Sequence, residues 1–483
     1  MRGQAAVVSG RVRLALRGRD RHKSMTRWPL GDIAQAVGGR LIRGSPEATV
    51  SGISTDTRAI KRGVLFVALK GKRFDAHTFL HDAVRKGAAA LLVSRAADAV
   101  PADSPAIAVA DTLKALQALA RWHRSSLHIP VIGVTGSCGK TTVKELIAAV
   151  LGSRFKTTRN PLSYNNDIGV PLSILAIDND TQVAVIEIGT NAPGEIAALC
   201  AIARPNRALI TNIGRAHLEG FGTCEAVAGE KSALVDAVGE RGTFYVNIDD
   251  PFCLGIADRF PGRRVTYGTG NGATWRAVRI ELSADAAKST LDIQPLGSFT
   301  VPLVGAHNAV NALAAIAVGA DFGLTREEIQ QGLDTAKPPP MRMNPMIKKG
   351  RVFLNDAYNA NPESMRAAIE TLASHAGSNR TIAVFGDMLE LGDVSLSEHR
   401  ELGRLVARAG INVLIVLGEF AQDVVEGALD AGLDSDRVRV CKDHSEAARV
   451  LQSVSAAGDV VLVKGSRAMA MEKVLEAFDT LSV

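Results

Sequence analysis

The sequence has few cysteines, and their arrangement argues against a cross-linked or zinc-binding scaffold. Five are present, Cys138, Cys200, Cys224, Cys253 and Cys441, scattered along 483 residues without close pairs. Disulfide frameworks and structural zinc sites use cysteines at short, recurring spacings. We therefore expect neither.

Long apolar runs are also lacking. No uninterrupted run approaches the roughly 20 apolar residues that a membrane-spanning helix needs. Apolar residues make up 46% of the chain and charged residues 22%, close to the average for globular proteins. This composition argues against a disordered or fibrous protein. We expect a packed cytoplasmic enzyme without a membrane partner.

Positive charge is in surplus only at one end of the chain. The formal net charge is +6, and residues 1–24 contain seven Lys and Arg residues against Asp20 alone, so this segment accounts for the whole surplus. A neutral remainder gives little electrostatic case for a nucleic-acid partner. We expect residues 1–24 to be a disordered basic extension before a second possible start at Met25, with an organelle transit segment as the alternative.

Apolar runs and turn residues predict an α/β fold in three domains. Residues 25–110 are strand-rich with short elements, typical of a small α/β domain. Residues 111–337 alternate strand-like and helical runs, which indicates a mostly parallel sheet covered by helices. Three prolines at 338–340 predict a linker. Residues 338–483 then show four strand–helix alternations, typical of a doubly wound sheet.

The predicted elements of the two larger domains follow from their apolar runs. For the middle domain we expect strands at Ile129–Val134, Val183–Ile188 and Ala208–Ile213, and helices at Thr142–Leu151 and Ala309–Gly319. For the last domain we expect strands at Arg351–Asn355, Thr381–Phe385, Val413–Leu417 and Val460–Val463.

The clearest motif is a glycine-rich loop between a predicted strand and a predicted helix. Its glycines let successive backbone N–H groups face an anion, and the helix N-terminus adds its dipole. Lys140 is expected to reach the terminal phosphates of a nucleotide, and the Thr141 hydroxyl to hold magnesium. Because Val134 replaces the first glycine of the common motif, the loop alone predicts only a nucleotide-binding enzyme. The candidate ATP contacts are Gly136, Ser137, Cys138, Gly139, Lys140, Thr141 and Thr142.

Two further polar residues follow predicted strands of the middle domain. Glu187 comes directly after an apolar strand, where its carboxylate could face the phosphate loop from a neighbouring strand and bind the metal. His217 also follows a strand end. Taken singly, such a carboxylate is often merely solvated and such a histidine is more often a local hydrogen-bonding group. In combination with the loop, both become candidate catalytic residues.

From about Met25 to its end the chain resembles the muramyl ligase family. The resemblance rests on the phosphate loop, on Glu187 and His217, and on two segments, Gly305–Asn311 and Asn355–Pro362. It implies a UDP-binding domain, a central P-loop ATPase domain and a C-terminal Rossmann-like ligase domain. Three further stretches point to the member of the family that adds D-alanyl-D-alanine: Asn165–Pro171, Phe385–Gly392 and Val463–Met469.

The resemblance also implies site residues outside the phosphate loop. Lys231, on a predicted helix after His217, takes the place of a lysine that becomes a carbamate and helps to position magnesium; Glu230 beside it differs from the family pattern. ATP contacts are implied for Asn308, Asn311, Arg342 and Asp356. Substrate contacts are implied for Thr55, Asp56, Thr57, Arg58, Lys70, Asn165, Asn166, Tyr358 and Asn359. Asn308 and Asn311, near the adenine, lie three apart, so one helix face could present both amides to the base.

The implied reaction joins D-alanyl-D-alanine to the carboxylate of a UDP-muramyl-tripeptide through an acyl phosphate, with ATP and two magnesium ions. The expected metal-holding residues are Thr141, Glu187, His217 and carbamylated Lys231. We expect a monomer acting on small molecules in peptidoglycan precursor synthesis. Two alternatives remain: another ligase of the superfamily, adding one amino acid to a muramyl peptide or glutamate to folate, or a phosphate-loop ATPase switch that makes no bond. The third residue of the tripeptide, diaminopimelate or lysine, stays open.

Overall fold

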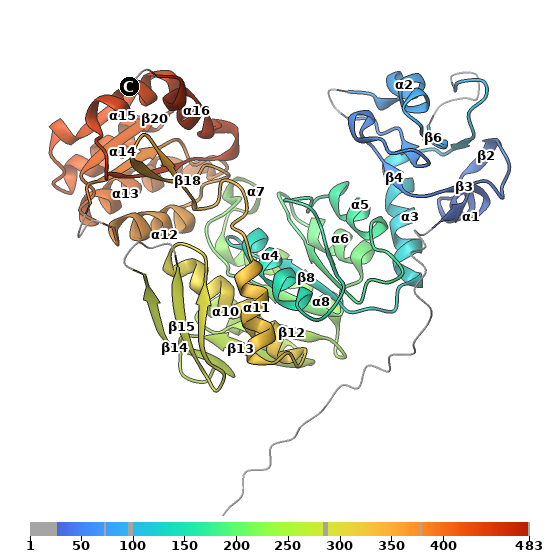
Figure 1. The fold of residues 1–483 in the computed structure, drawn as a ribbon, viewed down its shortest axis with the longest axis horizontal. Coiled ribbons are helices and arrows are strands. Elements are labelled where there is room, and N and C mark those ends of the chain that lie inside the picture. The colour runs from blue at the N-terminus through green and yellow to red at the C-terminus, as the bar shows by residue number, and fades with distance from the viewer. Residues whose placement is uncertain (1–26, 72–73, 95–99, 284–287, 376–378, 482–483) are drawn as a thin grey trace, which may run out of the picture.

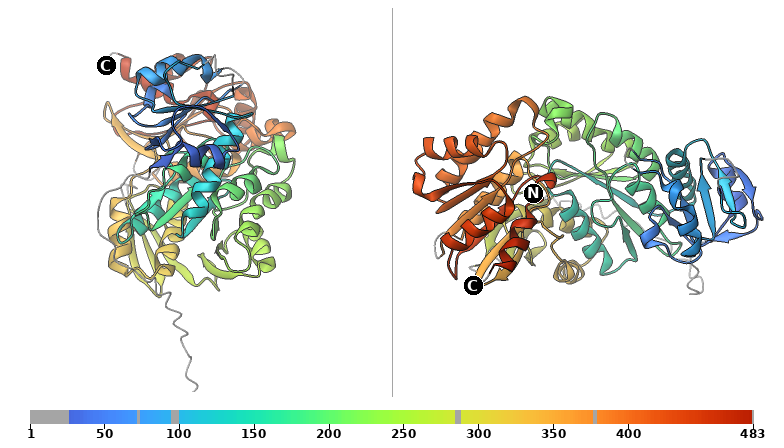
Figure 2. Two further views of the ribbon diagram at one scale, coloured as in Figure 1. Left: turned by 90° about the vertical axis from the view of Figure 1, so that its right-hand side faces the viewer. Right: turned by 90° about the horizontal axis from the view of Figure 1, so that it is seen from above.

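The fold is known from a computed structural model that describes residues 27–71, 74–94, 100–283, 288–375 and 379–481. The predicted basic extension at 1–24 lies outside these residues. Three α/β lobes follow one another along the chain (Figure 1), with the middle lobe between the other two (Figure 2). No helix within the described residues is both long and apolar enough to span a membrane.

The first lobe contains a small mixed sheet with short strands. In spatial order the five-stranded sheet is β2 (Arg40–Arg43), β7 (Ala106–Ala108), β6 (Ala90–Val93), β5 (Leu65–Val67) and β4 (Ile53–Ser54). A two-stranded ribbon of β1 (Trp28–Pro29) and β3 (Thr49–Val50), the helices α1 (Leu30–Ala36) and α2 (Leu80–Arg85), and the 3₁₀ turns η1 (Thr57–Ala59) and η2 (Ala76–Phe79) complete it. Helix α3 (Thr112–Ser126) leads into the middle lobe.

The middle lobe is built on a nine-stranded sheet that is mostly parallel. Its spatial order is β16 (Gly297–Val301), β15 (Ser289–Gln294), β14 (Trp275–Leu282), β13 (Arg263–Gly268), β12 (Thr243–Asn247), β11 (Arg207–Ile210), β8 (Val131–Thr135), β10 (Val183–Glu187) and β9 (Thr157–Arg159). Only the pairs β14–β15 and β15–β16 are antiparallel. The predicted mostly parallel sheet is confirmed, but its antiparallel end was not predicted.

Helices cover both faces of the middle sheet because successive strand residues point to opposite faces. On β8, Val131 belongs to the core beneath α3, α5 (Gly169–Leu175), α6 (Glu195–Ala203), α8 (Cys224–Val238) and α9 (Pro251–Arg259). Ile132 belongs to the core beneath α4 (Lys140–Gly152), α10 (Ala306–Asp321) and α11 (Arg326–Thr335). The strand is buried throughout, and this fixes the position of the loop that follows it.

The last lobe is a doubly wound sheet, as predicted. Its spatial order is β17 (Asn344–Lys348), β18 (Arg351–Asp356), β22 (Val460–Lys464), β19 (Thr381–Phe385), β20 (Val413–Leu417) and β21 (Val438–Cys441), with only β17 antiparallel. One face carries α12 (Pro362–Ala373), α13 (Ser395–Arg408) and α14 (Ala421–Asp430), and the other carries α15 (His444–Val454) and α16 (Glu472–Thr480). The 3₁₀ turns η4 (Gly392–Val394), η5 (Ser435–Arg437) and η6 (Arg467–Met469) lie between them.

Candidate active site

One large cavity lies where the middle and last lobes meet, and its volume is about 830 Å³. It joins residues that are far apart in the sequence, because the carboxyl ends of parallel strands open on the same edge of a sheet. Of the predicted site residues, those on its wall are Ser137, Cys138, Gly139, Lys140, Thr141, Thr142, Asn165, Asn166, Glu187, His217, Asn308, Asn311, Arg342, Asp356, Tyr358 and Asn359.

The phosphate loop connects β8 to α4, and two of its glycines have a conformation that other residues rarely adopt. Gly136 has φ +146° and Gly139 has φ +80°. A Cβ atom on Gly136 would lie 1.9 Å from the Thr211 hydroxyl, and one on Gly139 would lie 2.5 Å from Asn311 Oδ1. Both positions therefore require glycine. Asn311 lies against the phosphate loop itself.

The loop is held from behind by the segment after β11, which the sequence did not identify. The backbone N–H of Cys138 donates to Asn212 Oδ1 at 2.9 Å, and that of Ser137 donates to the Asn212 carbonyl at 2.9 Å. The Thr211 hydroxyl donates to the Cys138 carbonyl. Strand β11 thus ends earlier than the predicted Ile213, because Thr211 and Asn212 turn to hold the loop.

Lys140 is the first residue of α4 and folds back over the loop. Its Nζ donates to the carbonyls of Gly136 at 2.7 Å and Ser137 at 3.3 Å. Burial lowers the pKa of its ammonium, and the charge of Glu187 partly offsets that shift. A cation already placed over an anion cradle matches the predicted contact with terminal phosphates.

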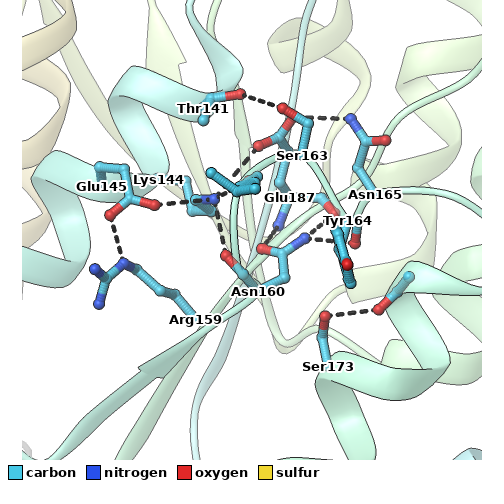
Figure 3. A network of polar contacts seen from close by, with 12 residues as sticks. Thr141, Lys144, Glu145, Arg159, Asn160, Ser163, Tyr164, Asn165, Ser173 and Glu187 are labelled. Carbon is cyan, nitrogen blue, oxygen red and sulfur yellow. Dashed lines mark hydrogen bonds and ion pairs between the residues drawn. The ribbon is translucent and has the colours of Figure 1, made fainter. Parts of the chain in front are cut away.

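Glu187 ends β10, which pairs with β8 so that Glu187 lies beside Val134. Its side chain is 1% exposed. Asn160 binds its backbone on both sides, donating to its carbonyl at 3.0 Å and accepting from its N–H at 2.9 Å. The Asn165 amide donates to Oε1 at 2.8 Å, while Oε2 is buried without a hydrogen bond (Figure 3). A buried carboxylate oxygen that has no hydrogen bond is suited to bind a cation.

His217 is held by a carboxylate from the last lobe. Its Nδ1 lies 2.6 Å from Glu390 Oε2, and this bond lowers the pKa of Glu390. Both residues have left-handed backbones, with φ 58° and 64°, a strained conformation that concentrates at functional sites. When Nδ1 donates to a carboxylate, neutral imidazole keeps its Nε2 lone pair available, which is the usual arrangement of a metal-binding histidine.

Lys231 lies on α8, as predicted for a helical residue, and is 1% exposed. Burial lowers the pKa of its amine to about 7, with the charge of Lys140 as the next cause. It is not part of the cavity wall, and no hydrogen bond or ion pair to its amine is found among the described residues. Glu230 accepts from the N–H groups of Gly194 and Ile196, so it binds the start of α6.

The two asparagines of α10 lie on one face, as their spacing predicts, but their amides bond to each other. Asn311 Nδ2 donates to Asn308 Oδ1 at 3.0 Å, and Asn308 Nδ2 donates to the Val304 carbonyl at 2.8 Å. Neighbouring His307 is half-buried, its Nδ1 is buried without a hydrogen bond, and desolvation lowers its pKa to about 4. The adenine contact of the asparagines remains a prediction.

The last lobe brings Arg342 and Asp356 to the cavity. The Arg342 guanidinium lies 3.9 Å from the ring centre of Tyr358, and its Nη2 lies 3.4 Å from the Ser163 hydroxyl of the middle lobe. Asp356 accepts from Lys464 Nζ and from the Met343 N–H. Lys464 also donates to the Asn359 carbonyl at 2.9 Å. Tyr358 therefore contacts the Arg342 cation, and Asn359 contacts the Lys464 cation.

The predicted UDP-binding residues are not part of this cavity. Asp56 pairs with Arg58 at 2.8 Å, and this bond lowers the pKa of Asp56 to about 2. The Arg58 side chain is 87% exposed. Thr57 and Arg58 form the turn η1, Thr55 precedes it, and Lys70 forms an isolated bridge with Asp75. The structure gathers these residues on the first lobe, and no described contact joins them to the phosphate loop.

Sequence reasoning missed several residues of the cavity wall. Gln117 and Arg121 on α3, with Glu195 and Leu199 on α6, extend the cavity toward the first lobe. Lys464 and Glu390 lie within stretches that resemble the family, but only the fold shows their partners. An apolar period in the sequence can mark such segments as helical, yet nothing in it distinguishes a cavity wall from a solvated face.

The wall residues fit a divalent cation only in part. Thr141 and the free Glu187 Oε2 offer hard oxygen ligands, which magnesium prefers. No group of three or more His, Cys, Asp or Glu side chains is arranged to hold a metal within the described residues. Of the four predicted metal-holding residues, only Glu187 and His217 are of these types. The other two are a threonine and a modified lysine. The fit therefore depends on Lys231.

Comparison with known proteins gives three consecutive family matches. The family models are the Mur ligase family catalytic domain at residues 49–124, the Mur ligase middle domain at 134–319, and the Mur ligase glutamate ligase domain at 341–467. Together they span the three lobes. They also agree with the position of the phosphate loop in the middle lobe.

Relatives of known name match nearly the whole chain. The UDP-N-acetylmuramoyl-tripeptide--D-alanyl-D-alanine ligase of Bacillus subtilis (strain 168) is 37% identical over 92% of this chain and 97% of its own length. MurF from Acinetobacter baumannii matches with a TM-score of 0.85 at 32% identity, over 95% of this chain and all of that one. MurF from Thermotoga maritima, solved in complex with ADP, matches with a TM-score of 0.77 at 30% identity, over 89% and 97%.

Proposed function

The chain belongs to the Mur ligase family, and from this premise we propose that it joins D-alanyl-D-alanine to a UDP-N-acetylmuramoyl-tripeptide using ATP. The observation that carries the proposal is a cavity where a glycine-lined phosphate loop meets Arg342 of the last lobe. It occurs in a chain that is similar, over nearly its whole length, to ligases named for this reaction. The reaction belongs to peptidoglycan synthesis and so serves cell-wall growth and division.

The chemistry requires activation of a carboxylate, because a free carboxylate is a poor acyl donor. Transfer of the γ-phosphoryl group to the peptide carboxylate forms an O–P bond, breaks the bond to ADP and gives an acyl phosphate. The dipeptide amine then attacks the acyl carbon, loses a proton and expels phosphate. The products are amide, ADP and phosphate.

The main barrier is repulsion between anionic groups. Two unit charges 4 Å apart repel by about 4 kcal/mol at an effective dielectric near 20. Lys140 and Arg342 supply positive charge at the cavity wall from opposite sides of the domain cleft. Fixed positive groups stabilise charge as it shifts to the leaving ADP without reorganising. Arg342 comes from the last lobe and already contacts Ser163 of the middle lobe, so the site depends on the two lobes being together.

We further propose that Thr141, Glu187, His217 and carbamylated Lys231 hold two magnesium ions. Bound magnesium would neutralise phosphate charge and align the reacting groups. The lowered pKa of Lys231, about 7, leaves much of the amine neutral near physiological pH. The neutral amine can add to CO₂, forming an N–C bond and releasing one proton, and the resulting carbamate is an anionic oxygen ligand.

The first lobe is proposed to hold the UDP end of the acceptor through Thr55, Asp56, Thr57, Arg58 and Lys70. The cavity extension along α3 and α6 leads from that lobe toward the phosphate loop, so it is a route for the muramyl peptide. Asn165, Asn166, Tyr358 and Asn359 then surround its reacting end. Such a channel keeps water from the acyl phosphate, which hydrolysis would otherwise destroy.

We place this reaction in the cytoplasm, where ATP is available, and propose that the enzyme acts as a monomer. All three lobes that contribute to the site come from one chain. Sedimentation of the purified protein with and without substrates tests the oligomeric state, and a stable dimer would contradict the proposal.

A coupled assay of ADP release tests the function itself. D-Alanyl-D-alanine is supplied with the diaminopimelate-containing or the lysine-containing UDP-muramyl-tripeptide, and single amino acids and a folate acceptor serve as alternatives. ADP release that requires both a tripeptide and the dipeptide is the expected result. Phosphate release that needs no amine would instead indicate an ATPase switch. The preferred tripeptide identifies the third residue of the acceptor.

A further inference from the structure

Lys144 is a buried cation to which the proposed reaction gives no role. It lies on α4 one turn after Lys140, yet its side chain is 0% exposed and is not part of the cavity wall. Burying an ammonium group is costly unless its donors are satisfied and its charge is paired. The position of this lysine therefore has to be explained by its contacts.

The ammonium of Lys144 has two hydrogen-bond acceptors and two carboxylates within ion-pair distance (Figure 3). Lys144 Nζ donates to the Asn160 carbonyl at 2.8 Å and to the Leu162 carbonyl. Glu145 Oε1 lies 3.1 Å away and forms an ion pair with the ammonium. Glu187 Oε2 lies 3.7 Å away, within ion-pair distance but without a hydrogen bond. The Lys144 ammonium thus lies beside Glu187 Oε2 but does not donate a hydrogen bond to it.

The two carbonyls belong to the segment 160–165, which carries most of the contacts that shape the Glu187 site. Asn160 binds the Glu187 backbone from both sides, and Asn165 binds Oε1. Ser163 in the same segment lies 3.3 Å from the Thr141 hydroxyl. One buried ammonium therefore holds the segment that fixes both candidate oxygen ligands (Figure 3).

We propose that Lys144 is a positioning residue for divalent-cation binding, which fixes segment 160–165 and keeps Glu187 Oε2 in place as a free ligand. The proposal rests on the metal-dependent phosphoryl transfer inferred above. Lys144 itself touches neither nucleotide nor metal. Loss of its donors releases the Asn160 and Leu162 carbonyls, so the segment shifts and Glu187 loses its fixed geometry.

The test measures binding of Mn²⁺ to the protein–ADP complex by the loss of the free-ion EPR signal at fixed pH. Lys144→Met keeps the side-chain length without donors or charge, Lys144→Gln keeps donors only, and Lys144→Arg keeps both. We expect Lys144→Met to weaken Mn²⁺ binding by about 10-fold or more, as loss of a positioning group typically does. Lys144→Gln should weaken it less, and Lys144→Arg least.

Lys156→Met is the matched control, because it removes a lysine that pairs with Asp180 on the surface of the same lobe. It should leave Mn²⁺ binding unchanged. Binding of UDP alone, whose proposed contacts lie on the first lobe, should be unchanged in all folded variants when it is measured by calorimetry without metal. This separates a local effect on the metal site from general loss of structure.

Unchanged Mn²⁺ affinity in folded Lys144→Met, or equal affinity in Lys144→Gln and Lys144→Arg, would overturn the proposal and leave Lys144 a purely structural residue. If Lys144→Met does not fold, the comparison of Lys144→Gln with Lys144→Arg decides alone. The proposed function fails separately, if the unmodified enzyme shows no ligation with either tripeptide. Because metal binding is read without turnover, the two failures are distinguishable.

Discussion

The two ends of the proposed substrate path are built differently. At the phosphate end, Lys144 and Glu187 are buried, and Asn160 holds the Glu187 backbone on both sides. At the UDP end, the Asp56 and Arg58 side chains pair with each other on an exposed turn. Removing one partner of a buried charge pair costs about 3 to 5 kcal/mol, whereas an exposed pair contributes about 0 to 1 kcal/mol. The phosphate end is therefore preorganised, and we expect the proposed UDP end to take its final form with its ligand.

The largest expected effect comes from the phosphate loop. Lys140→Ala removes the cation that lies over the cradle, so ligation should fall by at least about 1000-fold, the upper range for one transition-state contact. Binding of the UDP-tripeptide, which depends on the other end, should remain nearly intact in calorimetry. Retained turnover would refute the phosphate-loop assignment, and lost UDP-tripeptide binding would break the contrast between the ends.

Lys231 should have the next largest effect. Lys231→Ala is expected to lower kcat by about 100-fold, since an anionic ligand is lost, and a small added carboxylate such as acetate should restore part of the activity. Lys156→Ala provides the control at an exposed lysine. Low activity without rescue would leave the carbamate unsupported, and activity like that of the unmodified enzyme would remove it.

The pKa of Lys231 predicts that carbamylation of this residue depends on pH. Burial lowers this pKa from its usual value of 10.5 to about 7, so the amine is mostly protonated below pH 7 and increasingly neutral above it. Only the neutral amine adds CO₂, and carbamylation should fall as pH drops through 7. We expect added bicarbonate to stimulate enzyme stripped of CO₂, which ¹³C NMR of the carbamate carbon would follow. An unchanged carbamate signal between pH 6 and pH 8 (about one unit on either side) would contradict this.

Glu390 tests how far preorganisation extends across the domain cleft. Glu390→Ala leaves His217 Nδ1 without its carboxylate partner, and loss of such a partner typically costs about 10- to 100-fold in metal affinity or activity. Mg²⁺ titration of ADP release should show a raised half-saturating concentration. Glu419→Ala, in the same lobe, is the control. Unchanged Mg²⁺ dependence in Glu390→Ala would reduce the contact to a lobe–lobe hydrogen bond.

Arg58 should show the smallest effect. Arg58→Ala is expected to raise the KM for the UDP-tripeptide by about 10-fold, without changing the KM for ATP. Thermal unfolding should hardly change, because the Asp56–Arg58 pair is exposed. Lys61→Ala on the same surface provides the control. A larger loss in kcat than in KM would show that the UDP end also shapes the catalytic step.

The sequence was sufficient where structure follows from local pattern. Strand β19 was predicted at its observed bounds because Thr381–Phe385 is short, apolar and fully buried. Strands β14 to β16 were missed because several of their residues are exposed, which weakens the apolar signal. Strand β21 was missed for the same reason, because most of its residues are not buried.

Site residues divide in the same way. Lys140 follows from a motif whose residues are consecutive in the sequence, and Glu187 follows from a strand end. Glu390 lies 173 residues from His217, so only the fold brings them together. The sequence alone does not distinguish Lys144 from a solvated lysine on a helix. Only the fold shows that its ammonium binds carbonyls of segment 160–165. Contacts between distant segments are not encoded in any local spacing.

The most direct test of the proposed chemistry follows oxygen through one turnover. The tripeptide is prepared with ¹⁸O in its terminal carboxylate and converted with ATP and D-alanyl-D-alanine, and the released phosphate is analysed by mass spectrometry. Attack of the carboxylate on the γ-phosphoryl group predicts that each phosphate carries one oxygen from the peptide. Unlabelled phosphate released together with amide product would contradict the acyl-phosphate mechanism.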